Sequence, residues 1–317
     1  MAMLYTRRCL LVIILLLIAG VVNADELGAS PQLEGRMACQ RGVARLITWQ
    51  GADGSWQQDV GLTAHAALAL ALAAGNQPDA DAARSHARIF VQEMLARGTA
   101  AMSPATKGSE RLTAGAMAMA LRLFLREGAA VPPELVSRIQ SLVAAGNVPP
   151  ADAMVVCETL LLFQQQDMGR APSSDRGAPA MPEVAGQAEQ LLTNIIANGD
   201  DAVLEGARLA AQMATGDATA GAAARRRLEE MADDASGVCL AELYWLARVL
   251  YTQGASGNAG TAWRTPLMTV LLEKQRGDGG WGRVGNSPAA RIVDSAWALQ
   301  TLAVLLAATP QGGEWHR

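Results

Sequence analysis

Residues 46–56 read LITWQGADGSW, and residues 271–281 read LLEKQRGDGGW. Both stretches fit the pattern L-x3-Q-x3-G-x-W, and an aspartate stands directly before the glycine in each. A phrase that recurs near the two ends of one chain indicates an array of similar structural units. We therefore expect a closed repeat whose first and last units contain the same turn.

The first 24 residues have the composition of an export signal. Arg7 and Arg8 precede an apolar run at residues 10–22, and residues 22–24 (VNA) resemble a cleavage site. The run is shorter than the ~20 residues that span a bilayer. We predict a cleaved signal peptide at residues 1–24 and export to the periplasm or the cell exterior, with an uncleaved anchor as the alternative.

The rest of the chain is acidic. Removing Arg7 and Arg8 from the 26 basic residues leaves them outnumbered by the 30 acidic ones. Nucleic-acid-binding proteins usually carry a basic patch, so no nucleic-acid partner is expected. No later stretch reads as apolar enough for a second membrane span, so no transmembrane segment is expected after signal removal.

Three cysteines follow the predicted signal, at Cys39, Cys157 and Cys239. Their odd number and wide spacing match neither a disulfide framework nor a paired metal-ligand motif. One bridge with a free thiol and three buried, unpaired cysteines both remain open.

The hydrophobic pattern is helical almost throughout, and the residues that favour strands are sparse. Gly, Pro, Asn and Asp separate the periodic blocks, and Pro133 and Pro150 suit helix starts. We predict an all-α fold with helices at residues 36–49, 61–74, 79–97, 111–126, 133–145, 152–166, 183–197, 201–214, 217–233, 237–252, 262–275 and 290–307.

Two kinds of helix alternate along the chain. Those at residues 61–74 and 111–126 are apolar on nearly every face, as expected when both sides are buried. Others, such as residues 79–97, carry more charge. This alternation predicts an inner ring of helices inside an outer ring.

A Pro-, Gly- and Ser-rich loop at residues 167–183 separates six predicted helices from the other six. A boundary between two domains is one interpretation. We prefer a single domain at residues 25–317, because each half alone would leave an apolar layer uncovered.

Six helical hairpins with such phrases at helix ends resemble the α/α toroid of terpenoid (squalene) cyclases and protein prenyltransferase β subunits. The resemblance covers most of residues 36–307 and is strongest in the two phrases. In that family the glutamine ties helix ends together by hydrogen bonds and the tryptophan packs against it, while a glycine permits the turn. It implies these structural roles for Gln50, Gly54 and Trp56 in the first phrase and for Gln275, Gly279 and Trp281 in the second.

The catalytic strings that the family uses are absent. Residues 79–82 (DADA) begin the D-x-D-D string and then depart from it, and residues 200–205 (DDAVLE) place the glutamate one position late for D-D-x-x-D/E. Neither the D-x-C zinc string, in the chain after residue 24, nor the thioester string G-C-G-E-Q occurs. We therefore predict a protein without catalytic activity, metal or cofactor.

A zinc site is the alternative to that prediction. His65, Cys157, Cys239 and Asp294 are all able to bind zinc and lie near the starts of predicted inner helices. Buried cysteines and an ordinary helix-start aspartate explain the same residues, and we prefer this interpretation.

A ligand inside the ring would meet the polar and aromatic residues of the inner helices. Glu158 and Glu242 are expected in first helical turns, where the helix dipole favours a carboxylate. Arg291 and Asp294 are spaced to pair with each other. The candidate ligand contacts are His65, Glu158, Glu242, Tyr244, Arg291, Asp294 and Trp297.

These observations predict an exported toroid protein that binds an apolar small molecule or a protein partner through its central cavity or rim. The alternative is a divergent enzyme acting on an isoprenoid or other lipid, with Asp294 or Glu158 as its acid. A third is an exported carbohydrate-active α/α barrel, which needs two nearby carboxylates beside aromatic residues. The low aromatic content, 4%, argues against the third.

Overall fold

The structure is a computed structural model that describes residues 29–101, 113–168, 181–197, 205–233, 238–255, 262–283 and 285–307. Its described part is built of helices joined by turns, and its only pairing of strand type there is an isolated bridge between Trp56 and Asp59. The prediction of an all-α protein is confirmed. The helices are α2 (Ala29–Thr48), α3 (Val60–Ala73), α4 (Pro78–Ala101), α5 (Ala114–Arg126), α6 (Pro133–Ala144), α7 (Pro150–Met168), α8 (Met181–Ala197), α9 (Glu205–Ala214), α10 (Ala220–Asp233), α11 (Leu240–Ala255), α12 (Arg264–Lys274) and α13 (Pro288–Leu306).

Each helix overlaps its predicted range, and the differences lie at the ends. Pro133 and Pro150 begin α6 and α7, as expected for a residue without an amide proton. The loop predicted at residues 167–183 is too long at both ends, because α7 continues to Met168 and α8 begins at Met181. Its middle and the predicted signal at residues 1–24 lie outside the described residues.

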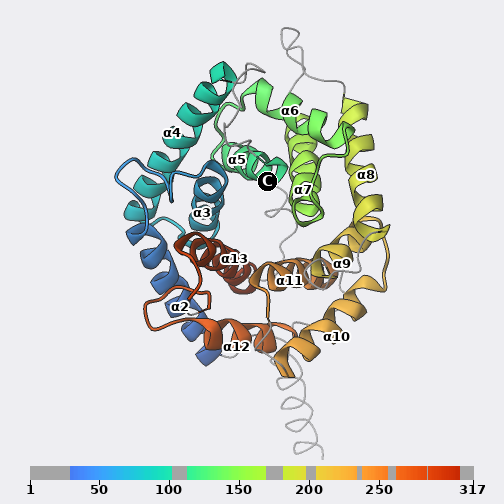
Figure 1. The fold of residues 1–317 in the computed structure, drawn as a ribbon. Helices are drawn as coiled ribbons and strands as arrows, with labels where there is room; N and C mark the ends of the chain where they lie inside the picture. Colours follow the sequence, from blue (N-terminus) through green and yellow to red (C-terminus); the bar gives the residue numbers. More distant parts are fainter. Residues whose placement is uncertain are drawn as a thin grey trace, which may run out of the picture.

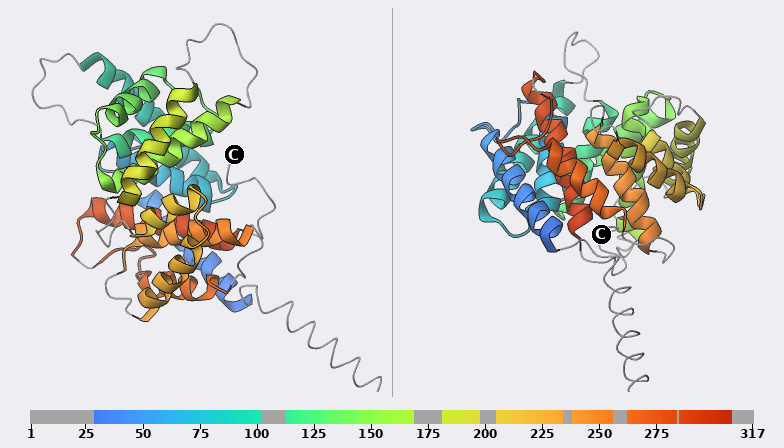
Figure 2. Two further views of the ribbon diagram at one scale, coloured as in Figure 1. Left: turned by 90° about the vertical axis from the view of Figure 1, so that its right-hand side faces the viewer. Right: turned by 90° about the horizontal axis from the view of Figure 1, so that it is seen from below.

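The helices form two layers, as Figure 1 shows. The helices α3, α5, α7, α9, α11 and α13 lie toward the centre, and α2, α4, α6, α8, α10 and α12 lie around them. Along the inner layer, α3 packs on α5 and on α13, α5 packs on α7, and α11 packs on α9 and α13. Helices α7 and α9 meet only sparsely. Seen from below, α2 lies beside α12 and α13, so the two ends of the described chain are neighbours (Figure 2).

Burial explains why some helices are apolar on nearly every face while others carry more charge. Ten of the residues of α3 between Val60 and Leu70 are buried, and together they cover every face of the helix. Outer helix α6 buries one stripe that includes Leu135, Ile139 and Val143. An all-round apolar helix is stable when protein covers both its sides, whereas a striped helix needs one covered side.

The first phrase connects α2 to its neighbours by side-chain hydrogen bonds. Gln50 Nε2 donates to the backbone oxygens of Gly54 and Ala83, at 2.8 Å each. The indole Nε1 of Trp56, which is fully buried, donates to the backbone oxygen of Leu46 at 2.9 Å. The glutamine amide therefore holds its own turn against α4, and the indole holds the turn against the end of α2.

The second phrase makes the same bonds between the two ends of the chain. Gln275 Nε2 donates to the backbone oxygens of Ala38 at 2.8 Å and Gly279 at 2.9 Å. The Nε1 of Trp281, also fully buried, donates to the backbone oxygen of Leu271 at 2.9 Å. Because Ala38 belongs to α2, this glutamine joins the last outer helix to the first.

Each tryptophan also fixes the following inner helix through its backbone. The amide of Trp56 donates to Thr63 Oγ1 at 3.0 Å, and the amide of Trp281 donates to Ser295 Oγ at 2.9 Å. Both hydroxyls are buried in their helices, α3 and α13. The phrase thus ties an outer helix, a turn and the next inner helix into one unit.

The aspartates before the motif glycines are turn formers. Asp53 Oδ1 accepts from the amide of Ser55 at 3.0 Å, and Asp278 Oδ1 accepts from the amide of Gly280 at 3.1 Å. A carboxylate that accepts a backbone hydrogen bond two residues ahead mimics a further turn of backbone. The bond from Ser55 also lowers the pKa of Asp53 below its usual value.

The two motif glycines are required by conformation and by space. Gly54 has φ +81° and Gly279 has φ +86°, in the left-handed region that other residues rarely adopt. A Cβ on Gly54 would lie 2.7 Å from the His86 carbonyl oxygen, and one on Gly279 would lie 2.8 Å from the Arg41 carbonyl oxygen.

We predict that Gly279→Ala lowers the free energy of unfolding by roughly 1–3 kcal/mol, since it forces a side chain into a left-handed backbone against a carbonyl. Gly277→Ala is the matched control: it lies two residues earlier, its φ is not positive, and a Cβ there would meet nothing within 4 Å. Urea unfolding followed by circular dichroism measures both variants. Equal stability of the two variants would contradict the structural role given to Gly279.

One described helix, α13, is long and apolar enough to cross a membrane by length and composition. The expectation that no stretch after the signal reaches this level is therefore wrong for α13. Of its apolar window, 61% is buried inside the protein, where α13 contacts α2, α3, α11 and α12. A buried core helix meets the same criterion as a membrane span.

Candidate functional site

One carboxylate joins three inner helices in the middle of the protein. Glu158 of α7 lies with its Oε2 2.9 Å from Nη1 of Arg122 on α5. Its other oxygen accepts a hydrogen bond from Nη2 of Arg248 on α11. Arg122 also reaches Tyr244 on α11, with 3.4 Å between Nη2 and the phenol oxygen. These four residues form what we call the central ion-pair cluster.

The cluster is charged although it is buried. Burial by itself lowers the pKa of both guanidinium groups, but the charge of Glu158 opposes this effect and the pKa values of Arg122 and Arg248 are raised. A buried charge is tolerated when it is paired and hydrogen-bonded. The pairing with Glu158 therefore keeps both arginines protonated inside an apolar layer.

An aromatic cluster lies against these charges. The rings of His65 on α3 and Trp297 on α13 meet edge to face, with 4.4 Å between their centroids. Tyr244 lies 4.9 Å from Trp297 and 5.0 Å from Trp245 by the same measure. Edge-to-face and tilted ring pairs stabilise a core beyond their burial alone. Tyr244 belongs to both clusters and connects them.

His65 is held neutral in this environment. Burial and, to a smaller extent, the positive charge of Arg122 together lower its pKa to about 3. Its side chain is almost wholly buried, and Nε2 has no hydrogen-bond partner among the described residues. The imidazole is therefore neutral near neutral pH, and it packs on the indole of Trp297 as part of the core.

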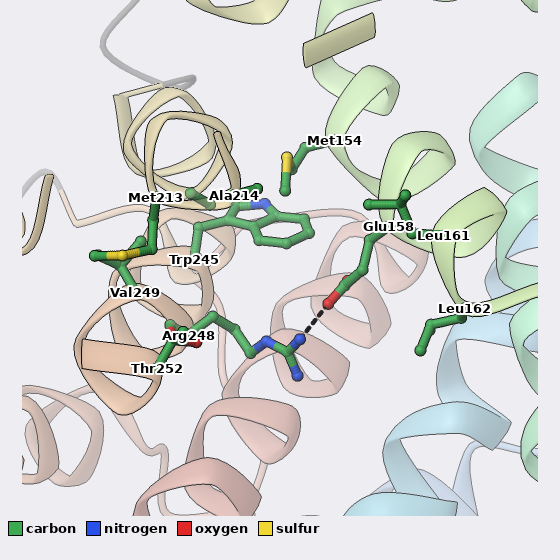
Figure 3. Close-up of a pocket in the computed structure, with 11 residues that line it drawn as sticks. Met154, Glu158, Leu161, Leu162, Met213, Ala214, Trp245, Arg248, Val249 and Thr252 are labelled. Carbon is green, nitrogen blue, oxygen red and sulfur yellow. Dashed lines mark hydrogen bonds and ion pairs between the residues drawn. The ribbon is translucent and has the colours of Figure 1, made fainter. Parts of the chain in front are cut away.

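A pocket of about 190 Å³ opens beside the central ion-pair cluster, between α7, α9 and α11. Figure 3 shows the indole of Trp245 lying across it, with Met154 and Leu161 on the α7 side and Met213 and Val249 opposite. The pocket lies where α7 and α9 meet only sparsely. A gap between two inner helices therefore gives access to the inner layer.

Charge and exposure vary along this pocket. Glu158 and Arg248 both line it, and their ion pair crosses its lower part in Figure 3. Ala214 and Thr252 also line it and are exposed, whereas Trp245 is buried. The pocket thus runs from an exposed mouth to a buried, partly charged floor.

A second pocket, of about 290 Å³, lies between α6, α7 and α8. It is lined by residues such as Val143, Gln190 and Ile195, and none of its lining residues is charged. It shares no residue with the two clusters, so we place the candidate site in the pocket beside Glu158.

The structure brings four of the seven candidate contacts together. His65, Glu158, Tyr244 and Trp297 meet in the two clusters. Glu158 lies in the third turn of α7, not in its first, because this helix begins at Pro150. That these residues bind a ligand stays a prediction.

Glu242 points away from this site. Its Oε1 accepts from Nε of Arg227 on outer helix α10 at 2.8 Å, and Glu242 does lie in the first turn of α11. The structure therefore assigns it to the contact between an inner and an outer helix.

Arg291 and Asp294 do not pair with each other, so the expected i,i+3 pair is wrong. Arg291 donates to Asp278 and lies over the ring of Trp49, 5.0 Å from its centroid. Asp294 accepts from Nδ2 of Asn286 at 3.2 Å. Burial raises the pKa of Asp294, and the Asn286 bond opposes this shift. Arg291 therefore binds the turn within the second phrase, and Asp294 binds the segment that follows the phrase.

Sequence reasoning missed the two arginines of the site. Arg122 and Arg248 each interrupt an apolar run, in LRLF (residues 121–124) and LARVL (residues 246–250). An arginine inside a helix that is buried on all faces needs an internal acidic partner. An arginine within an apolar run of a predicted inner helix is therefore a sequence pattern that identifies both residues as candidates for the site.

The cysteines are free thiols in the structure. Burial raises the pKa of Cys39 to about 11 and that of Cys157 to about 12. The Cys157 thiol donates to the Ala188 backbone oxygen at 3.6 Å, toward outer helix α8. In the described part of the chain, no group of three or more His, Cys, Asp and Glu side chains is placed to hold a metal ion.

We predict that His65 makes the fold less stable below about pH 6.5, because the unfolded chain takes up a proton that the folded chain refuses until about pH 3. The contribution is about 1.4 kcal/mol per pH unit across this window. His65→Gln should show a shallower loss of unfolding free energy from pH 6.5 to 4 than the unchanged protein. The exposed His86→Gln serves as control, and an unaltered slope in His65→Gln would refute the prediction.

Comparison with models of known protein families and with curated proteins finds no match for this chain. The resemblance to the cyclase and prenyltransferase scaffold therefore depends on the two phrases and on the arrangement of the helices.

Proposed function

We propose that this protein is an exported α/α toroid of the squalene cyclase and prenyltransferase kind that binds an apolar small molecule and does not catalyse a reaction. The toroid assignment is supported by the two phrases, which make equivalent hydrogen bonds at the two ends of the array. It is also supported by the alternation of inner and outer helices along the whole described chain (Figure 1). In this proposal residues 25–317 form one domain.

The pocket between α7, α9 and α11 is the observation that carries the binding role. Its volume, about 190 Å³, exceeds the ~150 Å³ of an aliphatic protein cavity that is known to take up benzene. Met154, Leu161, Met213 and Val249 present flexible or branched apolar groups to it, and Trp245 adds a flat apolar face. Burial of apolar surface against such a lining contributes roughly 25 cal/mol per Å².

A binding role fits the site better than acid catalysis. Glu158 is the acid that lines the pocket, and it forms ion pairs with two guanidinium groups. These positive charges stabilise its ionised form, whereas a general acid must carry a proton. Asp294 has a raised pKa but lies against Asn286 and does not line the pocket. A glycosidase needs two cooperating carboxylates, and Glu158 is the one carboxylate among the residues that line this pocket.

We predict that Ala214→Trp, which places an indole at the exposed mouth of the pocket, weakens binding of N-phenyl-1-naphthylamine by roughly tenfold or more, about 1.4 kcal/mol. This uncharged probe becomes fluorescent in apolar sites, so a titration reports its affinity. Ala144→Trp is the matched control, because Ala144 is also exposed and also ends its helix.

Two outcomes would count against the proposal. Absence of probe binding to the unchanged protein would remove the ligand role and favour binding of a protein partner at the rim. Equal loss in both tryptophan variants would show that the probe does not bind in this pocket.

Export is the second part of the proposal, and it rests on residues 1–24. We predict that expression in a Gram-negative host yields periplasmic protein whose first residue is Asp25, as determined by mass spectrometry of the intact chain. Deletion of residues 2–24 should leave the protein in the cytoplasm. Recovery of the full-length chain from the membrane fraction would instead support the anchor interpretation.

A further inference from the structure

The central ion-pair cluster beside the pocket contains more positive than negative charge. Arg122 and Arg248 each carry one positive charge, and the carboxylate that acts on both of them is Glu158. His65, next to them, is neutral. Among these described residues the charges sum to one positive, because a single carboxylate pairs with two guanidinium groups.

An unbalanced charge in an apolar interior is costly, and a ligand of opposite charge removes that cost. Arg122 is buried and is not part of the pocket lining. Arg248 does line the pocket, and its side chain keeps 18% of its exposure. The excess charge is therefore accessible to a ligand through Arg248.

Arg248 also has the donors that an anion needs. Its Nη2 donates to Glu158. A guanidinium has five N–H donors in a rigid fork, so the remaining nitrogens can bind one carboxylate while the pair with Glu158 persists. In Figure 3 the head of Arg248 and the apolar side chains of Met154, Leu161 and Trp245 face the same pocket.

We infer that the ligand is a monoanionic amphiphile of the fatty-acid type, with its carboxylate on Arg248 and its alkyl chain between Trp245, Met154 and Met213. This inference rests on the proposed binding function and specifies its ligand class. One excess positive charge matches one carboxylate. A phosphate head group with two negative charges would instead leave the cluster and its ligand with a net negative charge. The exposed residues at the mouth, Ala214 and Thr252, leave room for the rest of a longer chain.

Three probes of equal chain length test the charge. Octanoate, octan-1-ol and octylammonium are titrated separately against the protein with bound N-phenyl-1-naphthylamine. Octanoate should displace the probe at a concentration about tenfold or more below that of octan-1-ol, as expected for an added charge-assisted hydrogen bond. Octylammonium should be weaker than both.

Two variants should move this preference in opposite directions. Arg248→Gln removes the positive charge, so the preference for octanoate over octan-1-ol should disappear. Glu158→Gln removes the competing carboxylate, so the preference should increase. Arg248→Lys should keep part of the preference, and Arg208→Gln, which affects a surface ion pair with Glu205 on α9, should leave it unchanged.

The outcomes separate the two proposals. If octan-1-ol displaces the probe as well as octanoate does, the pocket binds apolar ligands and the fatty-acid inference is wrong. If the probe does not bind at all, the proposed function itself fails. Loss of folding in Arg248→Gln, seen by circular dichroism, leaves the decision to Glu158→Gln: its octanoate preference must rise, and an unchanged or smaller preference overturns the inference.

Discussion

The hydrogen bonds of the Gln275 side chain are the constraint on which the arrangement of this protein depends. One amide nitrogen binds its own turn at Gly279 and the backbone of α2 at Ala38, so it joins segments 237 residues apart in sequence. Ala38 lies in the middle of α2, and a carbonyl oxygen there has a second lone pair that can accept from the glutamine amide of a neighbouring segment. With α2 held against α12, helix α13 packs on α3, and His65 can therefore meet Trp297.

The packing of the inner helices against one another in turn decides how charge is placed in the interior. Glu158, Arg122 and Arg248 come from α7, α5 and α11, and none of them has a partner on its own helix in this cluster. Buried charges of this kind favour one relative arrangement of helices, because any shift leaves a charge unpaired at a cost of several kcal/mol. Trp245, one turn from Arg248 on α11, connects the packed aromatic cluster with the open pocket. The same helix thus contributes to the core and to the candidate site.

The pocket exists because the inner layer is incomplete between α7 and α9. Elsewhere neighbouring inner helices pack closely, but these two meet sparsely, and α8 covers the outside by packing on both. Apolar lining, an accessible arginine and a balanced carboxylate suit reversible binding of an amphiphile better than a reaction that needs a free acid. The proposed toroid scaffold and the proposed binding role are consistent with each other, since a ring of helices would provide an interior that need not be fully packed.

The sequence by itself determined the helices, their turns and the two phrases. Periodicity and the positions of Pro133, Pro150 and the motif glycines act over a few residues, so they can be read without the fold. A polar residue on an otherwise apolar helix is a candidate ligand contact. This criterion applies to His65 and Glu158, but it applies equally to Glu242. Only the tertiary structure decided that Glu242 pairs outward with Arg227 while Glu158 pairs inward with Arg122 and Arg248. That choice depends on how each helix is rotated and which helix lies beside it, and those quantities are set by packing between segments far apart in the chain.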